Sequence, residues 1–170
     1  MCKIRIIAAV VTFFISTLGG LASTNISNNI SQNTTWTLEG SPYIITKDIT
    51  VYSGALLSIE AGCEIRFAYN TSLTVKGRLS AAGYANSRIV FTSNDAAPSS
   101  PRWGSVSIST LESNQPSIIS NCDFYFGGRN MHAPLIVNTP SYPQIDGLTF
   151  FNNKFNAVEI TSAILGIDAT

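Results

Sequence analysis

The sequence predicts an all-β protein and, more narrowly, a right-handed, single-stranded parallel β-helix. No apolar i, i+3, i+4, i+7 stripe occurs after residue 22, so the sequence does not support helices. Apolar and polar residues instead alternate in short segments, as in half-buried strands. Glycines close several of these segments, and the stretches at residues 58–67 and 72–83 lack the Asn-Gly or Asp-Gly pair typical of tight hairpins. Together these observations favour short strands joined by corners.

Residues 1–22 have the order of a secretory signal peptide. Lys3 and Arg5 precede a mostly apolar run, which ends in the small residues Gly20-Leu21-Ala22. An uncleaved membrane anchor is the alternative, since the run approaches the ~18 residues of a membrane helix. The two glycines and the polar stretch that follows favour cleavage. We therefore expect a secreted chain that starts at Ser23, with no membrane span in the mature part.

Residues 23–35 are expected to form a flexible, glycosylated tail, because they carry little apolar surface. Asn-x-Ser/Thr sequons mark the acceptors of N-linked glycans in a secreted protein. Three lie in this tail and a fourth lies further along the chain, at Asn25, Asn29, Asn33 and Asn70. Chance is the alternative explanation, since Asn, Ser and Thr are abundant here.

Residues 36–170 are expected to form the β-helix. Segments such as Glu64-Ile65-Arg66-Phe67 and Leu73-Thr74-Val75 alternate between a core face and a solvent face. Stacked coils about 4.8 Å apart would bury the apolar face of each coil on the next. Roughly six or seven coils fit the length. The expected corner glycines, at positions that need a positive φ, are Gly54, Gly62, Gly77 and Gly83.

Two internal repeats favour stacked coils over a β-sandwich, which also has short strands but no such recurrence. The shorter repeat has a nearly even spacing, and its members are Ile59, Val75, Phe91 and Val106. The longer repeat is a 26-residue offset, which matches Ile119-x-x-Cys122-x-Phe124 to Ile145-x-x-Leu148-x-Phe150.

Two stretches carry a family resemblance: "SPYIITKDITVYSGALLSIEAGCEIRFAYNTSLTVKGRLSAAGYANSRIVFTSND" and, after it, "RWGSVSI". They resemble the opening module of secreted, pectin-lyase-like parallel β-helix proteins, although Ser105 stands where that pattern has Gly. Among animal proteins they are similar to the β-helix modules of the Bark beetle (Anakonda) group, large cell-surface proteins of epithelial junctions. The resemblance implies a fold strongly and a function weakly, because the module also recurs in bacterial surface proteins.

Pectin-lyase-like folds include polysaccharide lyases and hydrolases, so a carbohydrate-active enzyme, or a degenerate remnant of one, is the alternative function. Such sites need paired carboxylates or a calcium–carboxylate cluster. Asp123 and Asp146 are the best candidates, but the 26-residue offset aligns them with Thr149 and Ser120 and does not stack them on each other. We expect solvated turn charges, with no catalytic residue, metal or cofactor.

Three further side chains are candidates for ligand contacts. His132, the one histidine, has no nucleophile or metal ligand signalled nearby and is expected to lie on a surface loop. Arg129 beside it could touch a ligand, without further support from the sequence. Trp103 could stack on a sugar, but we favour packing at a corner, where it would close the loop before it onto the stack.

Cys63 and Cys122 alternate with core residues, so both are expected to face inward. A secreted protein with two cysteines invites a disulfide. Their separation corresponds to roughly three coils of ~4.8 Å, which exceeds the ~7 Å that a disulfide tolerates between Cα atoms. We therefore favour two free, buried thiols.

These observations favour a non-enzymatic extracellular or cell-surface scaffold or recognition module, in cell adhesion or cell-junction organisation. Its extracellular protein or glycan partner is not identified by the sequence. The mature chain has eight basic and ten acidic side chains and no basic stripe, which argues against nucleic acid. The last residues are apolar and uncapped (Ile160, Ile164, Leu165, Ile167), so we expect a truncated solenoid that self-associates through its C-terminal coil.

Overall fold

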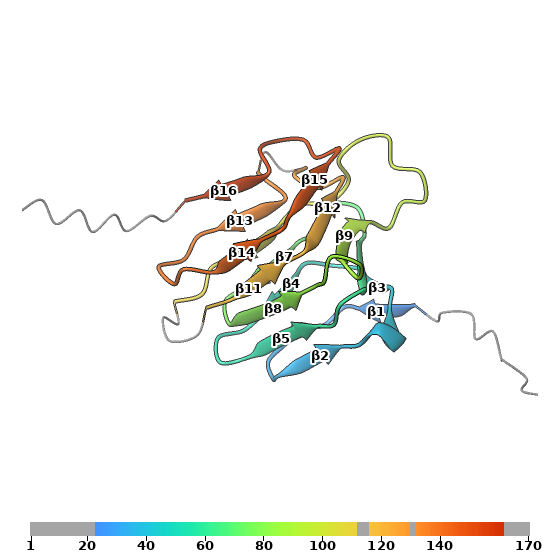
Figure 1. Ribbon diagram of the computed structural model, residues 1–170. Coiled ribbons are helices and arrows are strands. Elements are labelled where there is room, and N and C mark those ends of the chain that lie inside the picture. Colours follow the sequence, from blue (N-terminus) through green and yellow to red (C-terminus); the bar gives the residue numbers. More distant parts are fainter. Residues whose placement is uncertain (1–22, 112–115, 130–131, 162–170) are drawn as a thin grey trace, which may run out of the picture.

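The protein is a parallel β-solenoid of about five turns with almost no helix, shown in Figure 1 as a computed structural model. The structure describes residues 23–111, 116–129 and 132–161. The expected β-helix is thus confirmed at five turns, fewer than the six or seven expected. The predicted signal peptide, residues 1–22, and the apolar end at residues 162–170 lie outside the described residues.

Three parallel sheets form the walls of the solenoid. Sheet A contains β1 (Thr24–Ile26), β3 (Tyr43–Ile45), β6 (Glu64–Phe67), β9 (Ile89–Ser93), β12 (Cys122–Tyr125) and β15 (Thr149–Phe151). Sheet B contains β4 (Ile49–Val51), β7 (Leu73–Val75), β10 (Val106–Ile108), β13 (Leu135–Val137) and β16 (Val158–Ile160). Sheet C contains β2 (Thr34–Trp36), β5 (Leu56–Ile59), β8 (Arg78–Ala82), β11 (Ile118–Ser120) and β14 (Gln144–Asp146). A short 3-10 helix, η1, spans Leu38–Gly40.

The pairing of residues between stacked strands shows which of the two predicted repeats corresponds to one turn of the solenoid. Ile119 pairs with Ile145 and Phe124 with Phe150, so the 26-residue offset is confirmed as one turn. The shorter, nearly even spacing is wrong as a coil repeat. Its members Ile59, Val75 and Phe91 lie on β5, β7 and β9, which belong to sheets C, B and A. Every second strand along the chain has a similar spacing here, which produced that false period.

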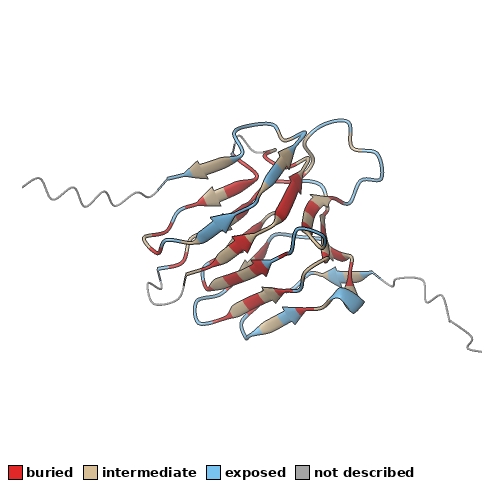
Figure 2. Ribbon diagram, in the orientation of Figure 1, coloured by how far each residue is buried: buried red, intermediate tan, exposed pale blue. Residues whose placement is uncertain are grey.

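The core is a set of columns that run along the solenoid axis. In sheet A, one column is Tyr43, Ile65, Phe91, Phe124 and Phe150. Its phenylalanine rings stack, with centroids 4.8 Å apart for Phe91 and Phe124 and 5.1 Å apart for Phe124 and Phe150. Figure 2 shows the buried positions alternating with partly exposed ones along the strands. Burial of each such side chain contributes roughly 1.5–3 kcal/mol.

The four corner glycines serve two different purposes. Gly54 and Gly62 have φ of 81° and 84°, as expected. Gly77 and Gly83 are not among the positive-φ glycines, so that part of the prediction is wrong. A Cβ at Gly77 would overlap the carbonyl oxygens of Ala55 and Tyr52 in the preceding coil. Close packing between coils, rather than backbone conformation, therefore requires glycine there.

Residues 23–35 form the first coil, which corrects the prediction of a flexible tail that ends before Trp36. β1 pairs with β3, and β2 pairs with β5. Ile30 bridges to Val51 and is buried. The segment is polar because only one face of it meets the core. The strands of the next coil satisfy its backbone hydrogen bonds, which composition alone does not reveal.

Candidate functional site

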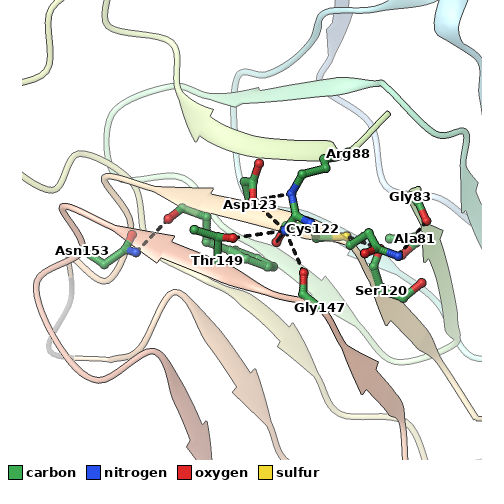
Figure 3. A network of polar contacts seen from close by, with 11 residues as sticks. Ala81, Gly83, Arg88, Ser120, Cys122, Asp123, Gly147, Thr149 and Asn153 are labelled. Carbon is green, nitrogen blue, oxygen red and sulfur yellow. Dashed lines mark hydrogen bonds and ion pairs between the residues drawn. The ribbon is translucent and has the colours of Figure 1, made fainter. Parts of the chain in front are cut away.

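The densest polar network of the structure is centred on Arg88, on the corner that precedes β9 (Figure 3). Arg88 Nε donates to Oδ1 of Asp123 at 2.8 Å. Arg88 Nη2 donates to the carbonyl oxygens of Cys122 at 3.1 Å and Gly147 at 2.7 Å. It also donates to Thr149 Oγ1 at 3.2 Å. One guanidinium therefore joins three consecutive coils.

Asp123 lies on β12 and is buried, with its side chain 11% exposed in the pair with Arg88. Burial, followed by the charge of Asp123, raises the pKa of Tyr125 above its ordinary value. The phenol of Tyr125 is thus held in its neutral form beside the carboxylate. The charge of Asp123 is balanced by the guanidinium of Arg88, 2.8 Å away.

The two candidate carboxylates, Asp123 and Asp146, lie in different sheets, as expected. Asp146 is exposed on β14 of sheet C and pairs with Ser120, whereas Asp123 pairs with Thr149 in sheet A. The alignment expected from the 26-residue offset is therefore confirmed for both carboxylates. Among the described residues, no group of three or more His, Cys, Asp or Glu side chains is placed to hold a metal ion.

Asparagine side chains at the corners form further hydrogen bonds between neighbouring coils. Asn153 donates from Nδ2 to the Phe124 carbonyl at 2.8 Å and accepts at Oδ1 from the Gly127 amide at 2.7 Å. Asn121 donates from Nδ2 to the Gly83 carbonyl at 3.1 Å. The sequence does not single out these residues or Arg88, because no local motif marks bonds between residues 26 to 61 positions apart. The network fastens coils together, which is a structural role.

Cys63 and Cys122 are free thiols, and both are fully buried. Cys122 pairs with Ile89, and the register of β6 with β9 places Cys63 against the other side of Ile89. The two thiols are therefore two coils apart, not three, at about 9.6 Å by the spacing of strands. Burial raises the pKa of Cys63 to about 11 and that of Cys122 to about 12.

Trp103 packs in the core, as favoured, and is not an exposed sugar platform. Its ring stacks on Phe67 at 4.2 Å between centroids, and it is fully buried. Its Nε1 donates to the Tyr125 carbonyl at 2.8 Å. Trp103 thereby anchors the connection at residues 94–105 to the core at the corner between sheets A and B.

The surface of this same corner holds the other two candidate contact residues. Arg129 lies over the ring of Tyr69, 4.1 Å from its centroid. His132 is exposed, as expected for a loop residue, and its Nδ1 lies 3.3 Å from Glu159 Oε2. The contact with Glu159 was not expected. The two residues belong to the same corner, but neither is joined to Asp123 or Asp146 by a contact in the described chain.

The four predicted glycan acceptors fall into two pairs. Asn29 Oδ1 accepts from the Thr50 amide and Asn33 Oδ1 accepts from the Leu56 amide, each at 2.9 Å. Both bonds link the first coil to the second. Asn25 and Asn70 are exposed, and their side chains make no hydrogen bond within the described residues. Whether any of the four is glycosylated stays a prediction.

The surface has shallow hollows at all three corners. One of about 440 Å³ is lined by Ser53, Lys76, Ser109, Leu111, Asn138 and Pro140. Another of about 550 Å³ lies between η1 and the Glu64–Arg66 ion pair. A third, of about 220 Å³, is lined by Ala68, Tyr69, Ser93, Asn94, Asp95 and Arg102. Within residues 23–161, where described, no helix is long and apolar enough to cross a membrane.

The chain is similar in sequence to Protein bark beetle of Drosophila melanogaster, with 47% identity over 53 residues. The match covers 31% of this chain and 2% of the relative, so the chain spans a very small part of that protein. No protein-family model matches the chain. No solved structure matches it either. The resemblance to the Bark beetle group is therefore supported over this stretch, and the pectin-lyase-like resemblance stays a prediction.

Proposed function

We propose that this chain is a non-enzymatic extracellular or cell-surface scaffold and recognition module that acts in cell adhesion or cell-junction organisation. The observation that carries the proposal is the 47% identity to Protein bark beetle over 53 residues, in a chain that folds as a β-solenoid. The family resemblance implies a role at cell junctions. The signal-peptide pattern of residues 1–22 implies export.

The polar network of the later coils supports a structural role. Arg88, Asp123 and Asn153 use their hydrogen-bonding capacity on neighbouring coils. A catalytic carboxylate needs an unoccupied oxygen aimed at a substrate and a second carboxyl group roughly 5–9.5 Å away. Asp123 is instead paired at 2.8 Å with a guanidinium that also binds two backbone carbonyls.

The long connections at one corner support a recognition role. Between sheets A and B, the chain uses residues 94–105 after β9 and residues 126–134 after β12. The corresponding connection after β3 is only residues 46–48. In solenoid proteins, insertions gather on one face, which is often the binding face. Ladder bonds from Asn70 to Arg102 and from Arg102 to Phe126 preorganise this corner.

The test uses the full chain expressed in cultured epithelial cells with its own residues 1–22. We expect the chain in the medium or at the cell surface, and we expect beads coated with it to bind the surfaces of those cells. The same preparation is incubated with polygalacturonate and followed by ultraviolet absorbance and reducing-end assays. Bound beads without turnover support the proposal. Turnover, or a chain that stays in the cytosol, contradicts it.

A further inference from the structure

Asn70 occupies an unusual place on the corner between β6 and β7. Its φ is 63°, a left-handed conformation that asparagine tolerates better than most residues. Its backbone amide donates to the Arg102 carbonyl at 2.8 Å, which holds the corner fast. The side chain is exposed and makes no hydrogen bond in the described part of the chain. Nδ2, the atom to which an N-linked sugar is attached, is therefore free.

The surface next to Asn70, formed by Tyr69 and the hollow beside it, has groups that suit contact with a sugar, and we call it the sugar seat. Tyr69 is 59% exposed, although the guanidinium of Arg129 lies over its ring at 4.1 Å. Beyond Tyr69 lies the hollow of about 220 Å³. Its polar walls are Asn94, the ion pair of Asp95 with Arg102 at 3.1 Å, and the buried Ser93, whose hydroxyl accepts from the Asp95 amide at 3.0 Å. An aromatic surface beside hydroxyl, amide and carboxylate groups suits a pyranose, which has apolar C–H faces and a polar rim.

The other acceptors lack this combination. Asn29 Nδ2 lies 2.9 Å from the Tyr52 hydroxyl, so a sugar on that nitrogen has to displace the contact. Asn33 binds the Leu56 amide through Oδ1. Asn25 is free but lies on β1, with no exposed aromatic residue adjacent to it in the sequence. Asn70 therefore combines a free attachment atom with a neighbouring ring.

We propose that Asn70 carries an N-linked glycan whose first sugar packs on Tyr69 and hydrogen-bonds into the hollow beside it. In the modification, Nδ2 of Asn70 displaces the pyrophosphate leaving group from C1 of the first N-acetylglucosamine of a lipid-linked oligosaccharide. The C–N bond forms, the C–O bond to the lipid pyrophosphate breaks, and Nδ2 loses one proton. The inference depends on entry into the secretory pathway, which is part of the proposed function.

The glycan covers part of the Tyr69 surface, which is 59% exposed beside its contact with Arg129. It also adds a contact to a corner whose backbone is already fixed by the Arg102 and Phe126 ladder bonds. Because little further ordering is required, the sugar contact should appear as a gain in thermal stability.

The experiment expresses the full chain in insect cells in two forms, one with its own residues 1–22 and one with a proven heterologous leader in front. Peptide mass spectrometry after enzymatic deglycosylation in heavy-oxygen water reports which asparagines carried glycans. We expect Asn70 to be labelled and the label to be lost in Asn70→Gln. Absence of a glycan on Asn70 under the heterologous leader overturns the proposal.

The sugar seat is tested by a double-mutant comparison of the glycan and the ring. The glycan is trimmed to its first sugar or removed, and the Tm is measured for the parent chain and for Tyr69→Ser. We expect the first sugar to raise the Tm of the parent by about 3 °C and that of Tyr69→Ser by less than about 1 °C. Tyr84→Ser, which changes a tyrosine that is also exposed, is the control and should keep the parent's rise.

The outcomes separate this inference from the proposed function. Equal shifts in the parent and in Tyr69→Ser overturn the seat on Tyr69, whatever the site occupancy. Glycosylation of Asn70 under the heterologous leader, together with failure of the chain's own leader, supports the glycan on Asn70 and contradicts the extracellular role. Glycosylation under both leaders without any binding to cells supports the glycan on Asn70 and contradicts the adhesion proposal.

Discussion

At the scale of single residues, Arg88 forms side-chain hydrogen bonds to residues as far as 61 positions away in the sequence. Its guanidinium contacts a carboxylate and a carbonyl on β12, the carbonyl of Gly147 before β15, and the hydroxyl of Thr149 on β15. Charged groups that are taken out of water cost free energy unless their partners compensate for the lost solvent. Because every contact of Arg88 joins different coils, the network resists separation of those coils.

Asp123→Asn should weaken this network without changing the shape of the side chain. The substitution leaves a partly buried guanidinium without its counter-charge, so we expect a loss of about 2–3 kcal/mol in the free energy of unfolding. Urea unfolding followed by tryptophan fluorescence measures it. The control is Glu64→Gln in the exposed pair with Arg66, where the loss should stay below about 1 kcal/mol. Equal losses in the two variants would show that Arg88 is not a fastener.

The two thiols predict a dependence of stability on pH in the alkaline range. Burial raises the pKa of Cys63 from 9.0 to about 11 and that of Cys122 from 9.0 to about 12. The unfolded chain therefore loses these protons at lower pH than the folded chain. The resulting stabilisation is complete below pH 9 and is lost as the pH rises toward 11 and 12.

Urea midpoints at about pH 8 and about pH 10 test this expectation. The midpoint should fall between the two values, and it should fall less in the double variant Cys63→Ala, Cys122→Ala. Tyrosine and lysine titrations are common to both proteins and cancel in the comparison. An identical fall in both proteins would mean that the thiols are as accessible in the folded chain as in the unfolded one.

At the scale of elements, the sequence predicted individual strands well and their stacking only in part. Alternation identifies β6 and β7, because each strand has one face in the core. Coil length is less visible, because the turn that leads from Tyr43 to its stacked partner Ile65 is much shorter than the turn from Phe91 to Phe124. Because the corners vary in length, a fixed offset finds one turn, as the 26-residue offset does, but not the other turns of the chain. The Arg88 network is hidden for the same reason.

The prediction for the first coil is wrong because the ordering of this coil comes from the coil above it. Its polar side chains look solvated in the sequence, yet Asn29 and Asn33 each accept a hydrogen bond from the backbone of the second coil. Parallel pairing of β1 with β3 and of β2 with β5 supplies its backbone hydrogen bonds. Local composition therefore predicts disorder where tertiary contacts impose a strand.

Asn33→Ala should destabilise the protein, whereas Asn25→Ala should not. The first substitution leaves the Leu56 amide without its side-chain acceptor, at a cost of about 1 kcal/mol. The second removes an exposed side chain that forms no hydrogen bond in the described chain. Both variants are made in a bacterial host, so that glycans do not enter the comparison. A flexible segment would give two unchanged midpoints in thermal unfolding.

At the scale of the whole molecule, the last described coil has strand edges without a described neighbour. β14, β15 and β16 each have a neighbouring strand on one side only among the described strands. Ile145 is 37% exposed although Ile119 beneath it is fully buried. Ile160 is 68% exposed although its partner Val137 is 5% exposed. Positions that belong to the core elsewhere in the stack thus face solvent here.

Unpaired strand edges and exposed core positions together favour edge-to-edge association. The chain expressed without residues 1–22 should therefore self-associate through β14–β16 as concentration rises, by pairing of strands from two copies. Sedimentation velocity across a concentration range of about a hundredfold measures the average mass, which should increase. Ile160→Lys places a charge on the open edge and should keep the protein monomeric, whereas Thr74→Lys, on the solvent face of β7, should not. A monomer at every concentration would show that this end is closed by the chain itself, and an unchanged oligomer in Ile160→Lys would place the contact on another surface.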